Sequence, residues 1–128
     1  MDREKLLDLY KKYELEKTDV YKHQHYVIIT RQGIEKIAAK ENIAMSYEVV
    51  KCDPNFAVVK AYAKNEEVQI ETFGSALKGA KYKEGNCNSW YVMEMAEKRA
   101  LSRSVLKLTG FYELGVFGED ESDDFKRK

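Results

Sequence analysis

Three consecutive segments in the middle of the chain alternate apolar and polar residues with a period of two, which is typical of β-strands that bury one face. They are residues 45–52, 56–64 and 67–73. The stretches between them are rich in residues that favour turns, Asp53-Pro54-Asn55 and Asn65-Glu66. The positions that this alternation turns inward are apolar and mostly small or branched (Ala57, Val59, Ala61, Ala63, Val68 and Ile70). We therefore predict a three-stranded antiparallel meander with one small, apolar face.

A segment with helical periodicity follows the meander, from Asn88 to Gly110. Asn88 or Ser89 can cap its first turn, and Gly110 is the residue type expected just past its last turn. A helix of roughly 20 residues spans about 30 Å, which is long enough to cross the predicted sheet. At 100° per residue, one arc of this helix is mostly apolar, and we expect it to pack on the meander (Trp90, Met93, Ala100, Leu101, Ser104, Val105 and Leu108).

Two shorter helices are predicted before the meander. Residues 2–17 carry an apolar stripe at helical spacing, and residues 31–41 follow Thr30, which is a good N-cap. Between these helices, His23 and His25 lie two residues apart on one face of a predicted short strand. Two histidines can begin a metal site, but we find no third ligand in the sequence, so we expect no bound metal.

The order of these elements predicts an α+β fold, in which N-terminal helices precede a β-β-β-α core formed by the meander and the long helix. Charge is unevenly spread along it. Residues 17–112 hold 15 Lys and Arg against 11 Asp and Glu, whereas residues 113–125 hold six acids and no base. We assign residues 1–118 to a single domain and residues 119–128 to an acidic, mobile tail, because the tail lacks the apolar residues needed to pack.

The composition and residue pattern indicate whether the protein enters a membrane or is exported. The chain lacks an apolar run of about 18 residues, so we expect no membrane span. Its N-terminal residues are charged and do not resemble a signal peptide. Cys52 and Cys87 stand alone, without the spacing of a metal site. Two free thiols in such a chain predict a reducing, cytoplasmic location.

The sequence does not contain the motifs of common enzyme classes. It has no phosphate-binding glycine loop with its lysine and no GxSxG nucleophile motif. The strands also lack the Glu-x-Lys pair that follows an acid in nucleases of the restriction-enzyme type. We therefore expect a protein that is not an enzyme and that needs no cofactor.

Basic residues gather between the meander and the end of the long helix, and we interpret them as a candidate site for a polyanion. Lysines interleaved with glycine and tyrosine suit a loop that contacts phosphates and stacks a base. A solvated loop and a solvated helix face explain the same residues without any ligand. The cations are Lys78, Lys81 and Lys83 in the loop, and Arg99, Arg103 and Lys107 on the helix arc opposite the apolar one.

The segment EMAEKRALSRSVLKLTGFYELGVFGEDESDDF resembles the C-terminal helix and tail of small phage and prophage single-strand annealing proteins, the Sak/Erf-like branch of the Rad fifty-two superfamily. The upstream helix ITRQGIEKIAAKEN, followed by three strands, is similar to the same family's core order. The resemblance implies rings or filaments of identical subunits that bind single-stranded DNA in a basic groove and anneal complementary strands without ATP. It assigns the DNA contacts to Arg99, Arg103 and Lys107, with Lys98 as a further member when the alignment is made on the KRAL stretch.

Two other functions remain open at this point. The chain can be a small protein-interaction module that acts through the long helix or the acidic tail, or an enzyme without a recognised motif. Self-association through the long helix and the sheet edge is also predicted. Glu94 and Glu97 fall on the apolar arc of the helix, where unpaired carboxylates are costly to bury, and the edges of an open meander need cover. Arg31 and Lys36 of a neighbouring subunit are candidate partners for these acids.

Overall fold

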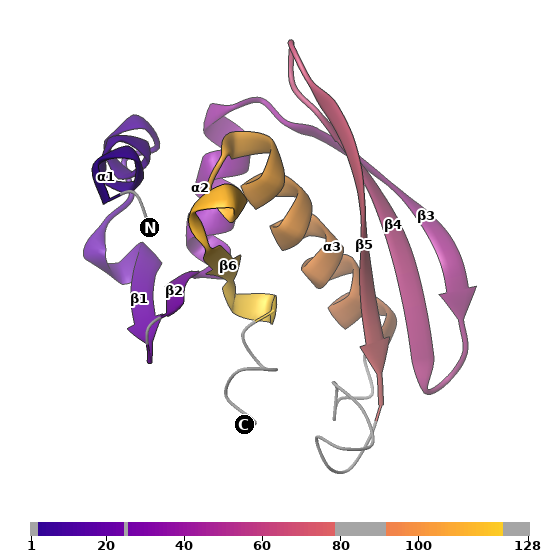
Figure 1. The fold of residues 1–128 in the computed structure, drawn as a ribbon. Helices are drawn as coiled ribbons and strands as arrows, with labels where there is room; N and C mark the ends of the chain where they lie inside the picture. Colours follow the sequence, from indigo (N-terminus) through magenta and orange to yellow (C-terminus); the bar gives the residue numbers. More distant parts are fainter. Residues whose placement is uncertain (1–2, 25, 79–91, 122–128) are drawn as a thin grey trace.

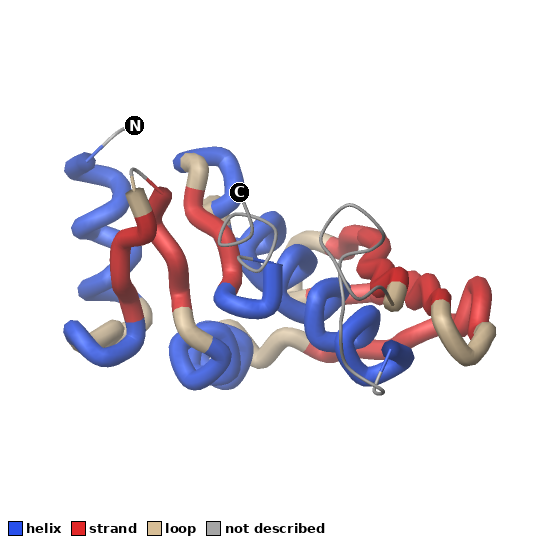
Figure 2. Tube along the Cα trace, turned by 90° about the horizontal axis from the view of Figure 1, so that it is seen from below, coloured by secondary structure: helices blue, strands red, loops and turns tan. Residues whose placement is uncertain are grey.

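The computed structural model describes residues 3–24, 26–78 and 92–121. In it, the long helix lies between two three-stranded sheets, one with long strands and one with short strands (Figures 1 and 2). The α-helices of the described part are α1 (Arg3–Lys12), α2 (Arg31–Lys40) and α3 (Val92–Thr109). The strands are β1 (Val20–His23), β2 (Tyr26–Ile29), β3 (Ala44–Cys52), β4 (Phe56–Lys64), β5 (Gln69–Leu77) and β6 (Val116–Gly118). Single 3₁₀ turns occupy Lys17–Asp19, Tyr112–Leu114 and Glu119–Glu121. The fold is therefore α+β, as predicted.

The large sheet is the predicted antiparallel meander, in the order β3-β4-β5. Alternate residues of β4 (Ala57, Val59, Ala61 and Ala63) are buried on one face, as their spacing predicts. The long helix α3 covers this face over β4 and β5 but has little contact with β3. The predicted β-β-β-α core is thus confirmed.

The approach of α3 to the sheet is closest at Gly74 of β5. A Cβ atom built on Gly74 would lie 2.2 Å from the carbonyl oxygen of Ala96 and 2.4 Å from the amide nitrogen of Ala100. The residues around this contact are small and fully buried (Ala57, Ala61, Ala76, Ala96 and Ala100). The helix backbone therefore rests directly on the sheet, where larger side chains would hold the two apart.

The third strand differs from its prediction at its first residues. β5 begins at Gln69, and the amide groups of Glu67 and Val68 donate to the Asn65 side-chain oxygen in the preceding turn. Val68 is 47% exposed, so its inward assignment is wrong, whereas Ile70 pairs with Ala63 and faces inward as predicted. The turn is two residues longer than predicted, because the Asn65 side chain caps it.

The small sheet joins the two ends of the described chain. β1 and β2 are antiparallel, and β6 pairs in parallel with β2 on its other side. Gln24 has a φ of 58° between β1 and β2, so the single strand predicted around the two histidines is wrong. His25 lies outside the described residues.

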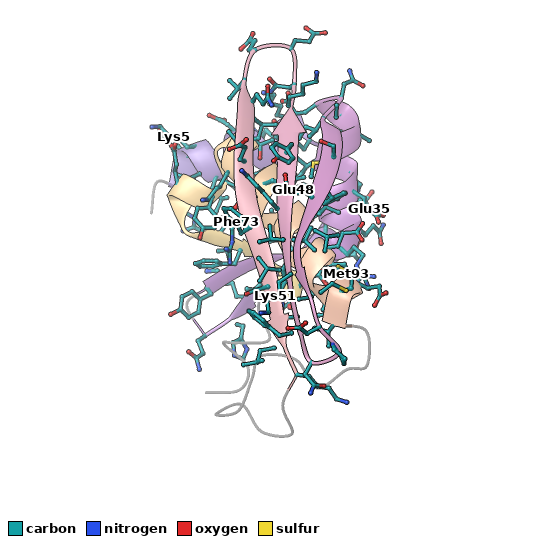
Figure 3. The ribbon with its side chains drawn as sticks, turned by 90° about the vertical axis from the view of Figure 1, so that its right-hand side faces the viewer. Lys5, Glu35, Glu48, Lys51, Phe73 and Met93 are labelled. Carbon is teal, nitrogen blue, oxygen red and sulfur yellow. The ribbon has the colours of Figure 1, made fainter. Side chains whose placement is uncertain are left out.

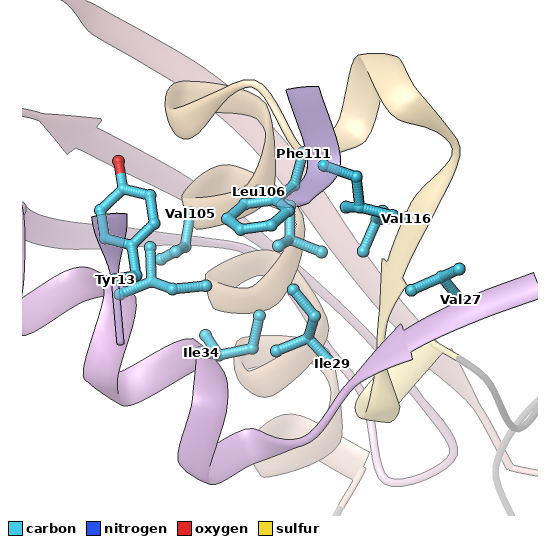
Figure 4. Close-up of a cluster of buried hydrophobic side chains, with 10 residues drawn as sticks. Tyr13, Val27, Ile29, Ile34, Val105, Leu106, Phe111 and Val116 are labelled. Atoms are coloured by element: carbon cyan, nitrogen blue, oxygen red, sulfur yellow. The ribbon is translucent and has the colours of Figure 1, made fainter. Parts of the chain in front are cut away.

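A second apolar cluster fills the space between the small sheet, α1, α2 and the last turns of α3 (Figure 4). Phe111 packs against Tyr10 and Tyr13, with ring centroids 6.5 and 5.9 Å apart. Its other buried members include Ile29, Ile34, Leu106 and Val116. α3 is therefore buried on two sides: the large sheet covers its N-terminal half, and this cluster covers its C-terminal half.

Helix ends follow the local signals in the sequence. The Thr30 hydroxyl accepts from the Gly33 amide at 3.2 Å, which caps α2 as predicted. Gly110 follows α3 with a φ of 90°, the left-handed conformation expected there. Asn88 and Ser89, the predicted caps at the other end of α3, lie outside the described residues. α1 ends at Lys12, earlier than predicted, because Glu14 takes a left-handed φ of 54°.

A buried ion pair fixes the connection between α1 and β1. The Asp19 carboxylate is fully buried and accepts from the Lys36 ammonium at 2.7 Å and from the Glu16 amide at 2.9 Å. Burial alone would raise the pKa of Asp19, but these donors outweigh it and hold the pKa below its usual value.

Replacing Gly74 with alanine should separate α3 from the sheet, because the new methyl group meets helix backbone that has no side chain to move aside. We expect Gly74→Ala to lower the free energy of unfolding by at least about 2 kcal/mol. Urea denaturation measures this. Ser75→Ala, one position along on the opposite face, should change it by less than about 0.5 kcal/mol. Equal stability of the two variants would contradict the direct backbone contact.

Asp19→Asn should lower the free energy of unfolding at neutral pH by about 1.5–3 kcal/mol, because the Lys36 ammonium loses its charged acceptor. The folded pKa of Asp19 lies below the unfolded value of about 3.9. The stabilisation is therefore present above that unfolded pKa and is lost as the pH falls through the folded pKa. Thermal unfolding followed from neutral to acid pH should show the two proteins converging. A constant difference across this range would exclude the charge-based account.

Candidate nucleic-acid interface

The predicted basic stripe on α3 does not form one solvent-exposed face. Arg99 is only 5% exposed, which corrects its assignment to the arc opposite the core. The physical reason is that α3 packs on two sides, with Ala96 facing the large sheet and Leu106 facing the second cluster. A helix buried on two sides has no single opposite arc, so its pattern of residues does not reveal which side is exposed.

Arg99 and Arg103 both reach the free edge of β5. One terminal nitrogen of Arg99 donates to the Ser75 carbonyl at 2.8 Å, and its Nε donates to the Asp120 carbonyl at 3.1 Å. A terminal nitrogen of Arg103 donates to the Phe73 carbonyl at 3.0 Å. β5 is an outer strand of its sheet. The two guanidinium groups therefore cover backbone carbonyls that an edge strand otherwise leaves open.

The remaining predicted cations are spread over different places. Lys107 is exposed, and its ammonium lies 5.2 Å from the centre of the Tyr112 ring. Lys98 is half-buried on α3. Lys78 directly follows β5, and its amide donates to the Asn55 carbonyl at 2.7 Å. Lys81 and Lys83 lie outside the described residues.

The two acids predicted to lie on the apolar arc are instead exposed. Glu94 and Glu97 both lie on the solvent side of α3, so they need no cation from a second subunit. The proposed partners are also engaged within the chain: Lys36 pairs with the carboxylate of Asp19, and Arg31 pairs with that of Asp120. These two acids therefore do not require a second subunit.

The first acidic residues after Gly118 belong to the folded domain. Asp120 is 6% exposed, and its carboxylate accepts from the Arg31 guanidinium at 3.1 Å and from the Ser102 hydroxyl at 3.4 Å. The Glu119 carboxylate accepts from the Arg31 amide at the start of α2. The predicted boundary at Gly118 is thus too early, because the Arg31 guanidinium and the Ser102 hydroxyl compensate the buried carboxylate of Asp120. Residues 122–128 of the predicted tail lie outside the described part.

The face of the large sheet turned away from α3 carries aromatic rings and lysines, and we call it the outer face. Figure 3 looks directly at it, with Phe73, Glu48 and Lys51 pointing toward the viewer. Phe73 is 48% exposed and pairs with Lys60 on the neighbouring strand. The Lys60 ammonium lies 5.6 Å from the centre of the Phe73 ring and 5.2 Å from that of Tyr62. The half-exposed ring of Phe73 and the partly buried ring of Tyr62 therefore flank a cation at the centre of this face.

Charge on the outer face is mixed. Lys51, Lys60 and Lys64 lie on it together with Glu48 and Glu71. The Lys60 ammonium is 3.5 Å from the Glu71 carboxylate, and the Tyr62 hydroxyl donates to Glu48 at 2.8 Å. Burial alone would lower the pKa of Lys60, but Glu71 and Tyr62 outweigh it and raise the pKa. Lys60 therefore stays positively charged at neutral pH.

The sequence contains a signal for this face, although the prediction of a basic site placed the cations elsewhere. The positions of β4 that alternate with its buried residues are Val58, Lys60, Tyr62 and Lys64. Lysine and tyrosine on the exposed side of a strand are also common on inert surfaces. What distinguishes them here is Phe73, which only the pairing of β4 with β5 brings beside Lys60.

The described residues show no sign of a metal site or of a membrane-spanning helix. Across residues 3–24, 26–78 and 92–121, no three His, Cys, Asp or Glu side chains gather closely enough to hold a metal ion. No helix in these ranges has the length and apolar character needed to cross a membrane. Comparison with known proteins finds no match: no protein-family model, no curated protein and no solved structure is similar to the chain at a significant level.

Arg99→Met should lower the free energy of unfolding by about 2–3 kcal/mol, because it removes the donor to the part-buried carbonyl of Ser75 and the buried carbonyl of Asp120. Lys107→Met, on the exposed side of the same helix, should change it by less than about 0.5 kcal/mol. Urea denaturation compares the two variants. If Arg99→Met is as stable as the parent protein, Arg99 is not the structural group that its contacts indicate.

Proposed function

We propose that the protein binds single-stranded nucleic acid on the outer face of its large sheet and anneals complementary strands without ATP. The observation that carries this proposal is the arrangement of Phe73, Lys60 and Tyr62, in which an ammonium group lies near a half-exposed phenylalanine ring and a partly buried tyrosine ring. A sheet that presents aromatic side chains to unpaired bases, with cations for the backbone, is a recurring way to bind single strands.

Phe73 and Tyr62 are suited to stack bases. The Phe73 ring is half-exposed, and Leu77, on the same face, extends the apolar surface along β5. Tyr62 also lines a shallow hollow at one end of the face with Ser46, Lys64 and Gln69. Stacking of a base on an aromatic side chain contributes about 1–3 kcal/mol and does not depend strongly on sequence, because every base has a π-face.

The lysines of the outer face are suited to contact phosphates, though weakly. Lys51 is more than half exposed, and its ammonium lies 5.9 Å from the centre of the Phe56 ring. Glu48 and Glu71 lie on the same face and reduce its positive potential. Each phosphate contact adds about 0.7 to the salt dependence of single-strand binding. A few lysines therefore predict modest affinity that falls with salt.

Modest affinity suits annealing. A protein that anneals strands makes and breaks no covalent bond, so it needs no catalytic group. It must hold the backbone while the bases stay able to exchange partners. The same activity is expected from the resemblance to phage single-strand annealing proteins, which act in homologous recombination. Within that proposal, the outer face of the sheet takes the role that the sequence assigned to α3.

Cations outside the outer face keep a secondary place in the proposal. Lys81 and Lys83 follow β5 in the chain and remain predicted phosphate contacts. Arg103, at the β5 edge, lies beside Phe73 in the structure. A protein partner of the residues after Glu121 and a cytoplasmic location remain predictions. No contact among the described residues bears on either of them.

Phe73→Ala should weaken binding of a fluorescein-labelled oligo-dT by about 5- to 100-fold, which corresponds to the loss of one stacking contact. Val68→Ala, which is about equally exposed but lies in the turn before β5, should bind like the parent protein. Fluorescence anisotropy measures both variants, and circular dichroism melts confirm that each is folded. Lys60→Gln should reduce the slope of log affinity against log salt by about 0.7.

The same titrations separate the competing functions. If Phe73→Ala and Lys60→Gln bind as the parent does while Arg103→Glu does not, the site lies on α3. If the parent protein does not bind oligo-dT or oligo-U even at low salt, nucleic-acid binding is excluded, and the exposed rings of the outer face point to a protein partner instead.

A further inference from the structure

The two edges of the large sheet differ in how they are covered. At the β5 edge, Arg99 and Arg103 occupy the carbonyls of Ser75 and Phe73. Within the described residues, no other element forms backbone hydrogen bonds with the free edge of β3. β3 is nine residues long and exposed at every position except Met45. A long exposed edge strand is a template for pairing with another strand.

Two large side chains of β3 are also exposed on the inner face of the sheet. α3 lies mainly over β4 and β5, so Tyr47 is 38% exposed and Val49 is 58% exposed. Both residues pair with buried positions of β4, Ala61 and Val59, which shows that they belong to the apolar side of the sheet. An apolar side chain next to an unpaired backbone edge provides both components of a strand interface.

We propose that a second copy of this chain pairs with this edge, β3 against β3 in antiparallel orientation about a two-fold axis. The asymmetry between the two edges favours this arrangement. A head-to-tail array requires β3 of one copy to pair with β5 of the next, where the arginines already hold the carbonyls. Of the two edges of the large sheet, only the β3 edge is open among the described residues, and an interface that uses the same surface on both copies closes as a dimer.

The residues of β3 select one register. When Tyr47 faces Tyr47 of the partner copy, Met45 faces the partner's Val49, and the apolar residues of the inner face meet. Centring the pair on Glu48 instead places two carboxylates side by side, which is destabilising. If the pair is centred on a later residue of β3, the β-bulge between Val49 and Lys51 falls within the ladder and disrupts its regular hydrogen bonding.

This register also provides a polar contact on the outer face. Ser46 comes to lie opposite Glu48 of the partner copy. Within one copy, the Glu48 carboxylate already accepts from the Tyr62 hydroxyl at 2.8 Å. A second hydroxyl, from the partner's Ser46, fits the remaining acceptor capacity of the same carboxylate.

The dimer would join two outer faces into one continuous surface. A two-fold axis perpendicular to the sheet keeps both outer faces on the same side, and each added strand widens the sheet by about 4.8 Å. A single strand of nucleic acid would then contact aromatic and lysine side chains from both copies. This consequence rests on the proposed function, whereas the pairing of β3 with β3 does not.

Engineered disulfides test the register in the full-length chain. In a background with Cys52→Ser and Cys87→Ser, Tyr47→Cys places two cysteines directly opposite each other. Opposite residues of an antiparallel pair have Cα atoms about 4.5–5.5 Å apart, which is within the range of a disulfide. Glu48→Cys is the matched control, because its two copies are offset by two residues and lie about 8 Å apart. Diamide oxidation followed by a non-reducing gel should give a dimer band for Tyr47→Cys only.

Sedimentation equilibrium of the unmodified protein provides the second measurement. We expect a mass of two chains, and Val49→Lys should return it to the mass of one chain, while Val68→Lys should not. Val49 and Val68 are both exposed, so melting temperatures should show that both variants keep the fold. A monomeric parent protein, or equal crosslinking of both cysteine variants, would overturn the proposal.

Oligonucleotide titrations distinguish a failure of the proposed dimer from a failure of the proposed nucleic-acid binding. Val49→Lys should bind a short oligo-dT like the parent protein but lose the gain in affinity that the parent shows for a longer one. If the parent protein is monomeric but still binds short oligo-dT through Phe73, only the dimer is excluded. If it is dimeric but does not bind oligo-dT, only the nucleic-acid function is excluded.

Discussion

The contact between the backbone of α3 and β5 at Gly74 determines the arrangement of the large sheet. An α-helix with its side chains is about 10 Å wide, and two strands span about the same distance. A helix held this closely over β4 and β5 therefore cannot also cover β3. The same closeness brings the guanidinium groups of Arg99 and Arg103 within reach of the β5 edge. The small glycine and alanine residues between α3 and the sheet thus account for the covered β5 edge, the open β3 edge and the free outer face.

α3 also connects two separate apolar clusters, which gives it an unusual pattern of residues. Its N-terminal half contributes Ala96 to the contact with the large sheet, and its C-terminal half contributes Leu106 to the cluster around Phe111. Where the two regions meet, Arg99 links β5 to the acidic turn through one guanidinium group. A buried cation with backbone partners can hold two layers in register, because a shift of either layer would break its hydrogen bonds.

Local signals in the sequence predicted much of the fold but little of the site. The alternation in β4, the Thr30 cap and the glycine after α3 depend on neighbouring residues, and the structure confirms all three. The burial of Arg99 and the docking of Asp120 depend on partners far along the chain. The candidate site shows the same limit, because Lys60 and Tyr62 were visible as a pattern, but only strand pairing brings Phe73 beside them.

The parallel pairing of β6 with β2 has a consequence for how the protein folds during synthesis. The β1–β2 hairpin completes its sheet only with β6, which lies much later in the chain, and Arg31 meets Glu119 across 88 positions. Contacts of such long range form slowly, because the intervening chain must be ordered first. The meander, in contrast, is built from neighbouring strands with short turns and can form early. The β1–β2 hairpin therefore lacks its final neighbour until β6 has been synthesised.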